Sequence, residues 1–190
     1  MADNKRGSGE RVNGGDQRGL SERALAAIKG VLPGSGDEDA ITLLKRDHDE
    51  VEELFDEFFR AQESGERAEQ TRVALEVCAL LTVHAQIEEE LFYPRAARNA
   101  DDARDLVREA TVEHSTVKDL VARLQAMRPE DEMFDATFQV LSEYVKHHVK
   151  EEEGELFPRV RASDLDVDAL GRALEQRKLE LMTAVATATR

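Results

Sequence analysis

Two similar stretches of the sequence each pair a histidine with a glutamate four residues later. The first holds His84 and Glu88, and the second holds His148 and Glu152. In both stretches a Leu-Phe pair follows, and a proline stands ten residues after the histidine. Residues four apart lie on one face of an α-helix, one turn apart. An imidazole and a carboxylate placed in this way can bind one metal ion, so the repeat predicts a metal site.

The four-residue spacing by itself is not specific. His48–Glu52 and His147–Glu151 have the same spacing, and a chain with 41 acidic residues produces such pairs by chance. The two-copy repeat with its shared Leu-Phe and proline is the stronger signal. We therefore treat His147, Glu151 and Glu52 as look-alikes.

The elements that must position these residues are helices, and no segment has the pattern of a strand. We expect an all-α fold, an up-down-up-down four-helix bundle with a short N-terminal helix and a C-terminal fifth helix. Residues 1–37 are expected to be a disordered extension holding the short helix at 20–32, residues 38–161 the bundle, and residues 162–190 the C-terminal amphipathic segment. The four long helices are predicted at about 38–63, 67–98, 101–127 and 131–161, and the fifth at 164–186. Pro94 and Pro158 should kink or end their helices.

Each long helix has one apolar stripe, and each stripe contains one histidine. These are His48, His84, His114 and His148, whereas His147 lies off its stripe. The histidines should also lie at one height. For example, His48 is 17 residues before the predicted turn at Gly65 and His84 is 19 residues after it, an offset of only about 3 Å at the helical rise.

Four buried imidazoles and two carboxylates at one level would be costly without a partner, since each unpaired buried polar group costs roughly 2–7 kcal/mol. A metal ion removes that cost. Six such ligands are too many for one tetrahedral zinc ion. They suit two ions, each with two histidines, bridged by Glu88 and Glu152. Nitrogen and carboxylate ligands without thiolate favour iron, with manganese or zinc as alternatives. Ferritin-like bundles use Glu-x-x-His, which no histidine here completes.

The pattern of His48, His84-x-x-x-Glu88, His114 and His148-x-x-x-Glu152 resembles the hemerythrin-like HHE cation-binding domain family. The resemblance covers about residues 38–160. It implies a bundle that holds a non-haem di-iron centre with an oxo or hydroxo bridge. The implied ligands are the two glutamates, both bridging, and four histidines: His48, His84, Glu88, His114, His148 and Glu152.

The chain departs from the oxygen-carrying members of that family in two ways. Lys118 stands where their third helix has a second histidine, and Glu152 follows its histidine by four residues where they have an aspartate after five. One iron is thus left with two histidines, which argues against reversible oxygen carriage. We expect Lys118 to extend outward along its aliphatic stem. Tyr93 and Tyr144 lie close enough along their helices for one of them to supply a further ligand, but the interpretation that we favour is that both are boundary aromatics.

Composition restricts the partners. The net charge of −15 argues against nucleic acid and anionic membranes. No apolar run reaches the roughly 18 residues of a membrane span, and the polar N-terminus lacks a signal-peptide pattern. Cys78 is the single cysteine and lies in an apolar run, so we place it in the core. These features predict a soluble cytoplasmic protein, and no feature identifies a protein partner.

Three functions are compatible with this site. The chain either binds oxygen, nitric oxide or peroxide for sensing, detoxification or iron handling, or turns over peroxide as a catalase-like or peroxidase-like enzyme. The third alternative is a metal-responsive interaction module without turnover. Peroxide consumption separates the second from the others, and comparison of the apo and iron-loaded forms isolates the third.

Overall fold

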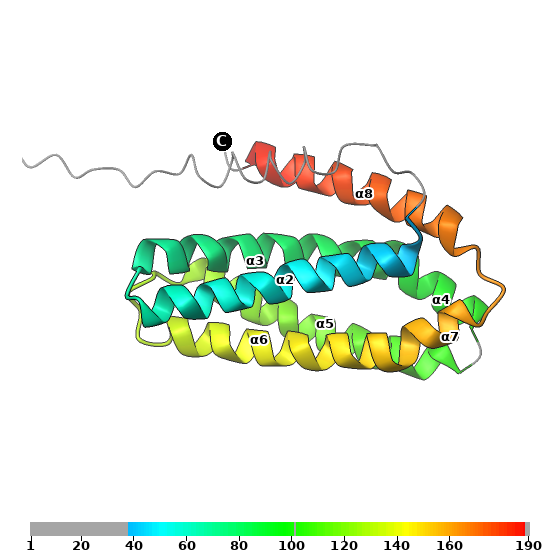
Figure 1. Cartoon of the computed structure of the whole chain (residues 1–190), viewed down its shortest axis with the longest axis horizontal. Helices are drawn as coiled ribbons and strands as arrows, with labels where there is room; N and C mark the ends of the chain where they lie inside the picture. The colour runs from blue at the N-terminus through cyan, green and yellow to red at the C-terminus, as the bar shows by residue number, and fades with distance from the viewer. Residues whose placement is uncertain (1–37, 101, 189–190) are drawn as a thin grey trace, which may run out of the picture.

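The computed structural model describes residues 38–100 and 102–188, and these residues form helices without any strand (Figure 1). The predicted all-α bundle is confirmed. The disorder predicted for residues 1–19 and the helix predicted at 20–32 lie outside the described residues. The elements are α2 (Ala40–Glu63), α3 (Arg67–Ile87), η1 (Glu88–Phe92), α4 (Tyr93–Asn99), α5 (Ala103–Ala126), α6 (Phe134–Glu151), η2 (Glu152–Leu156), α7 (Phe157–Arg161) and α8 (Val167–Ala188).

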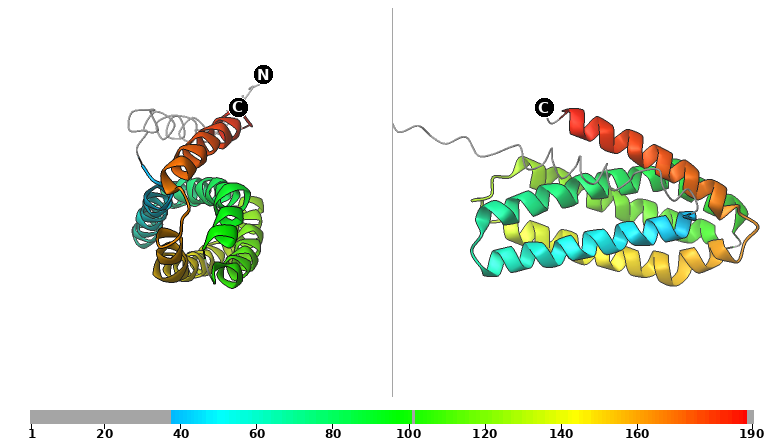
Figure 2. Two further views of the ribbon diagram at one scale, coloured as in Figure 1. Left: turned by 90° about the vertical axis from the view of Figure 1, so that its right-hand side faces the viewer. Right: turned by 45° about the horizontal axis from the view of Figure 1, so that its top comes forward.

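Four rods of helix surround a common axis. The rods are α2, then α3 with η1 and α4, then α5, and finally α6 with η2 and α7 (Figure 2). Asp39 caps the first rod by accepting hydrogen bonds from the backbone N–H groups of Ile41 and Thr42. The last rod begins at Phe134 rather than near residue 131. Asp131 is held in the preceding turn instead, because its side chain accepts a hydrogen bond from the Arg128 N–H.

The second and fourth rods do not end at their prolines, and each contains a short π-helical segment. These segments, η1 and η2, begin at Glu88 and Glu152, and both rods continue as α-helix past Pro94 and Pro158. Proline lacks an N–H group and clashes with the carbonyl one turn earlier, and the wider π-turn relieves that conflict. The π-turn therefore begins at the equivalent residue in both copies of the repeat, and that residue is the candidate ligand, Glu88 or Glu152.

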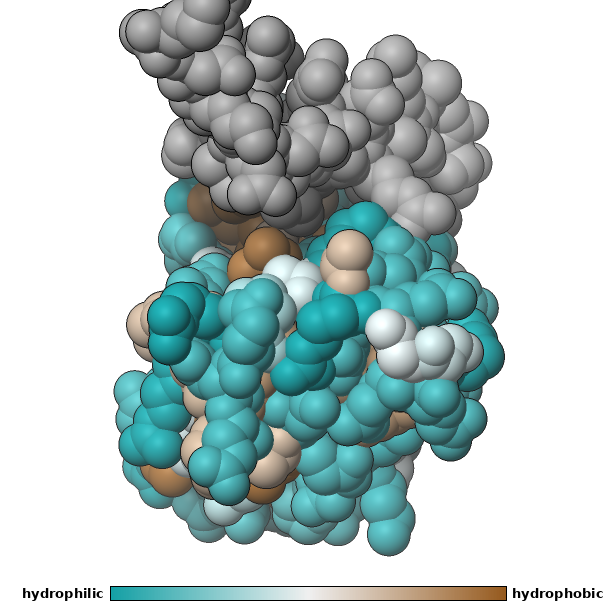
Figure 3. Space-filling model, turned by 90° about the vertical axis from the view of Figure 1, so that its left-hand side faces the viewer, coloured by the Kyte–Doolittle hydropathy of each residue, from teal (hydrophilic) through white to brown (hydrophobic). Residues whose placement is uncertain are grey.

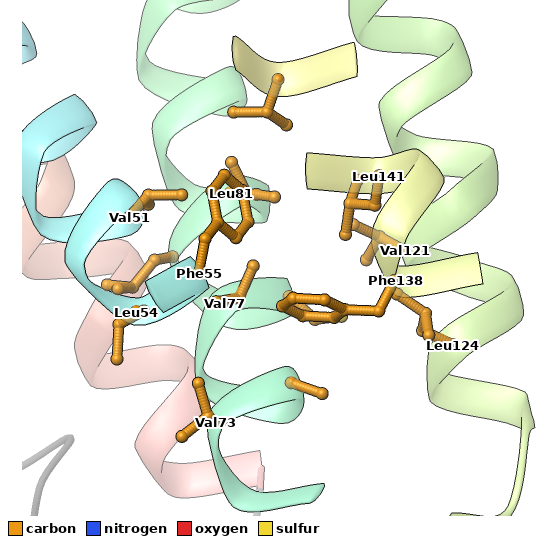
Figure 4. Packing of buried hydrophobic residues seen from close by; sticks show 14 of the residues in the cluster. Val51, Leu54, Phe55, Val73, Val77, Leu81, Val121, Leu124, Phe138 and Leu141 are labelled. Carbon is orange, nitrogen blue, oxygen red and sulfur yellow. The ribbon is translucent and has the colours of Figure 1, made fainter. Parts of the chain in front are cut away.

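Two hydrophobic clusters fill the bundle on either side of the histidine level. The cluster near the turns at residues 64–66 and 127–133 includes the stacked pair Phe58 and Phe138, and part of it is drawn in Figure 4. The other cluster lies toward α4 and α7 and includes Phe92 and Phe157. Cys78 is fully buried in the first cluster, as predicted. The end of the bundle that carries these turns is mostly hydrophilic on its surface (Figure 3).

The fifth helix, α8, lies outside the ring of four rods and runs at an angle over α2 and α3 (Figures 1 and 2). Leu170 and Leu174 bury their side chains in the second cluster. Gly171 lies directly against the start of α2, where an added Cβ would stand 2.3 Å from the carbonyl oxygen of Glu38. Any larger residue would push α8 away from the bundle, so this helix is fitted closely to it.

Candidate metal centre

The six residues predicted as ligands converge inside the bundle, and all six are buried. The ring nitrogens meet in two pairs. His48 Nε2 lies 3.2 Å from His84 Nε2, and His114 Nε2 lies 3.1 Å from His148 Nε2. The four histidines therefore do arrive at one level, with their Nε2 atoms pointing inward.

Each candidate glutamate lies between the two histidine pairs. Glu88 Oε2 is 3.2 Å from His84 Nε2 and 3.4 Å from His114 Nε2. Glu152 Oε2 is 3.4 Å from both His48 Nε2 and His148 Nε2. A carboxylate that faces one histidine of each pair is arranged as a bridge between two ligand sets.

The site contains carboxylate oxygens that no hydrogen bond satisfies. Within the described residues, both oxygens of Glu88 and one oxygen of Glu152 are buried without a hydrogen-bond partner. Asp47 Oδ2 and His84 Nδ1 are in the same condition. Buried carboxylates without partners are strongly unfavourable, and a bound metal ion would supply the missing partner. The donor set of imidazole and carboxylate fits iron, manganese or zinc.

The second ring nitrogen of each of these four histidines faces a carboxylate on a neighbouring rod. The Nδ1 atoms of His48, His114 and His148 lie 2.9, 3.1 and 2.8 Å from Glu153, Glu89 and Glu113. His84 Nδ1 lies 3.6 Å from Asp47 Oδ2, just beyond a hydrogen bond. A carboxylate on Nδ1 holds the ring orientation and leaves Nε2 free to bind metal.

These four carboxylates are functional candidates that our sequence analysis missed, although a signal was present. Each one is the sequence neighbour of a ligand: Asp47 precedes His48, Glu113 precedes His114, Glu89 follows Glu88 and Glu153 follows Glu152. Neighbouring residues are turned by about 100° around a helix. An acid beside an inward-facing ligand therefore points toward the adjacent rod and its histidine.

The structure separates the two tyrosines. Tyr144 is 45% exposed and lies away from the site, as we interpreted it. Our interpretation of Tyr93 as a boundary aromatic is wrong, because Tyr93 is 2% exposed. Its hydroxyl donates to Glu152 Oε1 at 2.8 Å and lies 3.1 Å from His114 Nε2. The π-turn η1 precedes Tyr93 and alters the rotation of the helix, which a regular helical pattern does not anticipate.

The look-alike residues and Lys118 remain outside. His147 has a side chain that is 61% exposed, and Glu52 is also exposed. Lys118 extends outward as predicted, with its Nζ 2.6 Å from each oxygen of Glu89. It thus binds the carboxylate that faces His114 rather than the metal site itself.

Ionisation of the site follows from its contacts. Burial disfavours charge on Glu88, but His84 and His114 beside it hold the pKa of this carboxyl well below its usual range. Burial also opposes protonation of His84, yet Glu88 and Asp47 raise the pKa of this imidazole to about 10. The metal-free site thus holds a proton on His84 that a metal ion must displace.

A small cavity of about 20 Å³ lies beside the four histidines, on the side of the first hydrophobic cluster. Its remaining walls are largely apolar, with Val51, Leu81, Val117 and Val145 among them. A cavity of this volume accommodates about one water-sized molecule. The metal site therefore borders a space for a ligand of two or three atoms.

Comparison with known proteins identifies the family and supports the fold. A crystal structure of a hemerythrin HHE cation binding domain-containing protein from Mycobacterium kansasii has a similar fold, with a TM-score of 0.66 and 23% identity over 77% of this chain and 89% of that chain. A DNA nickase from Nostoc sp. is 31% identical over 152 residues, which are 75% of this chain but only 41% of that protein. The family model of the hemerythrin HHE cation binding domain matches residues 39–160. This chain therefore belongs to the hemerythrin HHE cation-binding domain family.

Proposed function

We propose that the chain binds two iron ions, with His48 and His84 on one, His114 and His148 on the other, and Glu88 and Glu152 shared between them. The observation that carries this proposal is the arrangement of the two glutamates, each of which faces one histidine of each pair at 3.2 to 3.4 Å. Iron bound there would supply redox chemistry and open positions for a small ligand. Manganese and zinc are the alternative metals.

The ligand we propose is oxygen, nitric oxide or peroxide. The cavity of about 20 Å³ beside the histidines excludes larger molecules. A surface groove of about 480 Å³ between α2 and α6 shares His48, Val145 and Val149 with this cavity, so it is the route by which the ligand arrives. The role that follows is sensing, detoxification or iron handling in the cytoplasm.

Stoichiometry is the first test. The metal-free protein is loaded anaerobically with iron(II), freed of excess, and its iron content is measured. We expect two iron atoms per chain, and a saturating value of one contradicts the two-ion centre. Manganese and zinc loaded in competition with iron show which metal the site prefers.

Ligand binding is the second test. Nitric oxide added to the iron(II) protein should change its optical spectrum, and the change should be absent without iron. Added peroxide distinguishes binding from turnover. Steady consumption over many equivalents identifies an enzyme, whereas a single stoichiometric reaction identifies a sensor or scavenger.

Membrane and nucleic-acid partners are not part of the proposal. None of the helices between residues 38 and 188, so far as they are described, has the length and apolar character of a membrane span. The Nostoc relative is called a DNA nickase, but this chain spans less than half of that protein. A net charge of −15 opposes binding to a phosphate backbone.

A further inference from the structure

Three of the four carboxylates that face the histidine Nδ1 atoms are themselves paired with a lysine. Asp47 binds Lys178 at 2.6 Å, Glu89 binds Lys118 at 2.6 Å and Glu153 binds Lys45 at 2.9 Å. The positive charge offsets the negative charge that the carboxylate adds beside the metal site. Glu113, the fourth, has no Lys or Arg partner within the part of the chain that the structure describes.

Instead of a lysine, Glu113 faces His147 and Glu151 on α6. His147 Nε2 lies 3.7 Å from Glu113 Oε1 and 3.2 Å from Glu151 Oε1. Each of the three residues offers one ligand atom, and these atoms all lie within 4.8 Å of one another. An imidazole with two carboxylates suits a divalent transition-metal ion. A cation held there would offset the negative charge of Glu113, as a lysine does at each of the other three carboxylates.

This cluster is connected to the buried centre. The other oxygen of Glu113, Oε2, lies 2.8 Å from His148 Nδ1, so one carboxylate contacts both the exposed His147 and the buried His148. A crevice of about 10 Å³ lies alongside, and its polar lining consists of the exposed or half-buried Glu109, Glu113 and Glu151 and the buried His148 and Glu152. Its remaining lining is apolar and comes from Leu106, Ala110 and Leu156. The carboxylates of Glu109, Glu113 and Glu151 would attract a cation toward the ligands.

We propose that Glu113, His147 and Glu151 form an outer site for a divalent metal ion, from which iron(II) passes to the His148 and Glu152 side of the buried centre. The transfer role rests on the function proposed above, whereas the outer site does not require it. Three protein ligands leave coordination positions open to water, and His147 is 61% exposed, so an ion held there can exchange. His147 and Glu151, the look-alikes of the sequence pattern, would then be needed for loading and not for the final centre.

The outer site is tested with cobalt(II), added to the full chain after the buried centre has been filled with iron. The visible absorption of cobalt should reveal one further ion per chain. His147→Ala and Glu151→Gln should each weaken this binding by about tenfold or more, the size of effect typical of lost metal-site contacts. Glu155→Gln is the matched control. Like Glu151→Gln, it removes one negative charge, but from η2 one turn after Glu151, at a residue that is exposed and paired with Arg159, and it should leave cobalt binding unchanged.

The transfer role is tested by the rate of anaerobic iron(II) uptake into the metal-free protein. His147→Ala and Glu151→Gln should slow uptake several-fold and reach the same final iron content, while Glu155→Gln loads at the wild-type rate. Unchanged uptake rates in both variants, or no cobalt beyond the filled centre, would overturn the proposal. A lower final iron content in His147→Ala also overturns it, because His147 would then belong to the centre itself. Failure of the wild type to hold two iron atoms is a separate result and counts against the proposed function.

Discussion

Lys178 of the C-terminal helix donates a hydrogen bond to Asp47 of α2 at 2.6 Å, and both side chains are buried, at 6% and 4% exposure. Asp47 in turn faces His84 Nδ1 at 3.6 Å. Burial opposes charge on Asp47, but His84 and Lys178 lower the pKa of this carboxyl below its ordinary value. The fifth helix therefore reaches the candidate metal centre through a single lysine.

Lys178→Met should destabilise the metal-free protein strongly. The substitution leaves a buried carboxylate with one partner fewer, and breaking a buried ion pair from one side typically costs about 3–5 kcal/mol. The free energy of unfolding from denaturant titration measures the loss. Arg177→Gln is the control, because Arg177 lies on the surface of the same helix α8 and pairs there with Glu90 of η1, and exposed pairs of this kind contribute little to stability. Equal losses in the two variants would mean that the buried pair of Lys178 and Asp47 stabilises the fold no more than the surface pair of Arg177 and Glu90.

His148→Ala should lower the iron content of the purified protein, because it removes an Nε2 atom from the centre. His147→Ala, one residue earlier, should leave the final content nearly unchanged, since its side chain is 61% exposed and points outward. Elemental analysis of the two variants gives the comparison. The reverse result would show that the inward face of α6 has been assigned one residue out of place.

Tyr93→Phe removes a single oxygen atom from the group of donors around His114 and Glu152. The ring stays in place and the six proposed ligands are unchanged, so we expect a folded bundle and near-normal iron content. The optical spectrum of the iron-loaded protein should shift, because the hydroxyl lies within the ligand cluster. Tyr144→Phe, at the exposed tyrosine, should leave the spectrum as it is. If the two variants have the same spectrum, the Tyr93 hydroxyl does not influence the metal.

Val149→Phe should slow the uptake of nitric oxide by the iron(II) protein. Val149 lines both the surface groove and the inner cavity, so a larger side chain there narrows the connection between them. Iron content should not change, since Val149 is not a ligand. Val140→Phe adds the same bulk at an exposed position of α6 and serves as the control. Stopped-flow rates that are equal in the two variants would place the entry route elsewhere.

The metal affinity of the centre should rise with pH between about 6.5 and about 10. His84 has a pKa raised to about 10 in the metal-free fold, above its ordinary 6.5, so a proton competes with metal throughout this interval. The same shift stabilises the metal-free fold fully below pH 6.5, and that contribution is lost as the pH rises toward 10. From about pH 6 to about pH 9, metal titrations should therefore show a rising affinity. Denaturant titrations over the same interval should show a falling contribution of His84 to the free energy of unfolding of the metal-free protein. A metal affinity that does not vary with pH would contradict the protonated state of His84.

The sequence by itself determined the four helices and the six residues that meet inside them. Helical periodicity is a local property, so it places His48, His84, His114 and His148 on their apolar stripes without reference to any other segment. Short turns then set the histidines at nearly one height. The repeated proline also marks the second and fourth rods as a pair.

Only the tertiary structure decided which side chains surround those ligands. A stripe defines the inward face of a helix but not the rod on either side of it, so the pairing of Glu113 with His148 or of Asp47 with His84 was not predictable from one helix at a time. The π-turn at Glu88 changes the helical rotation that follows it, which brings Tyr93 into the site. Lys178 is 131 residues from Asp47 in sequence, and only the close packing of α8 at Gly171 brings them together. Such contacts depend on how whole helices fit against one another, which local pattern does not encode.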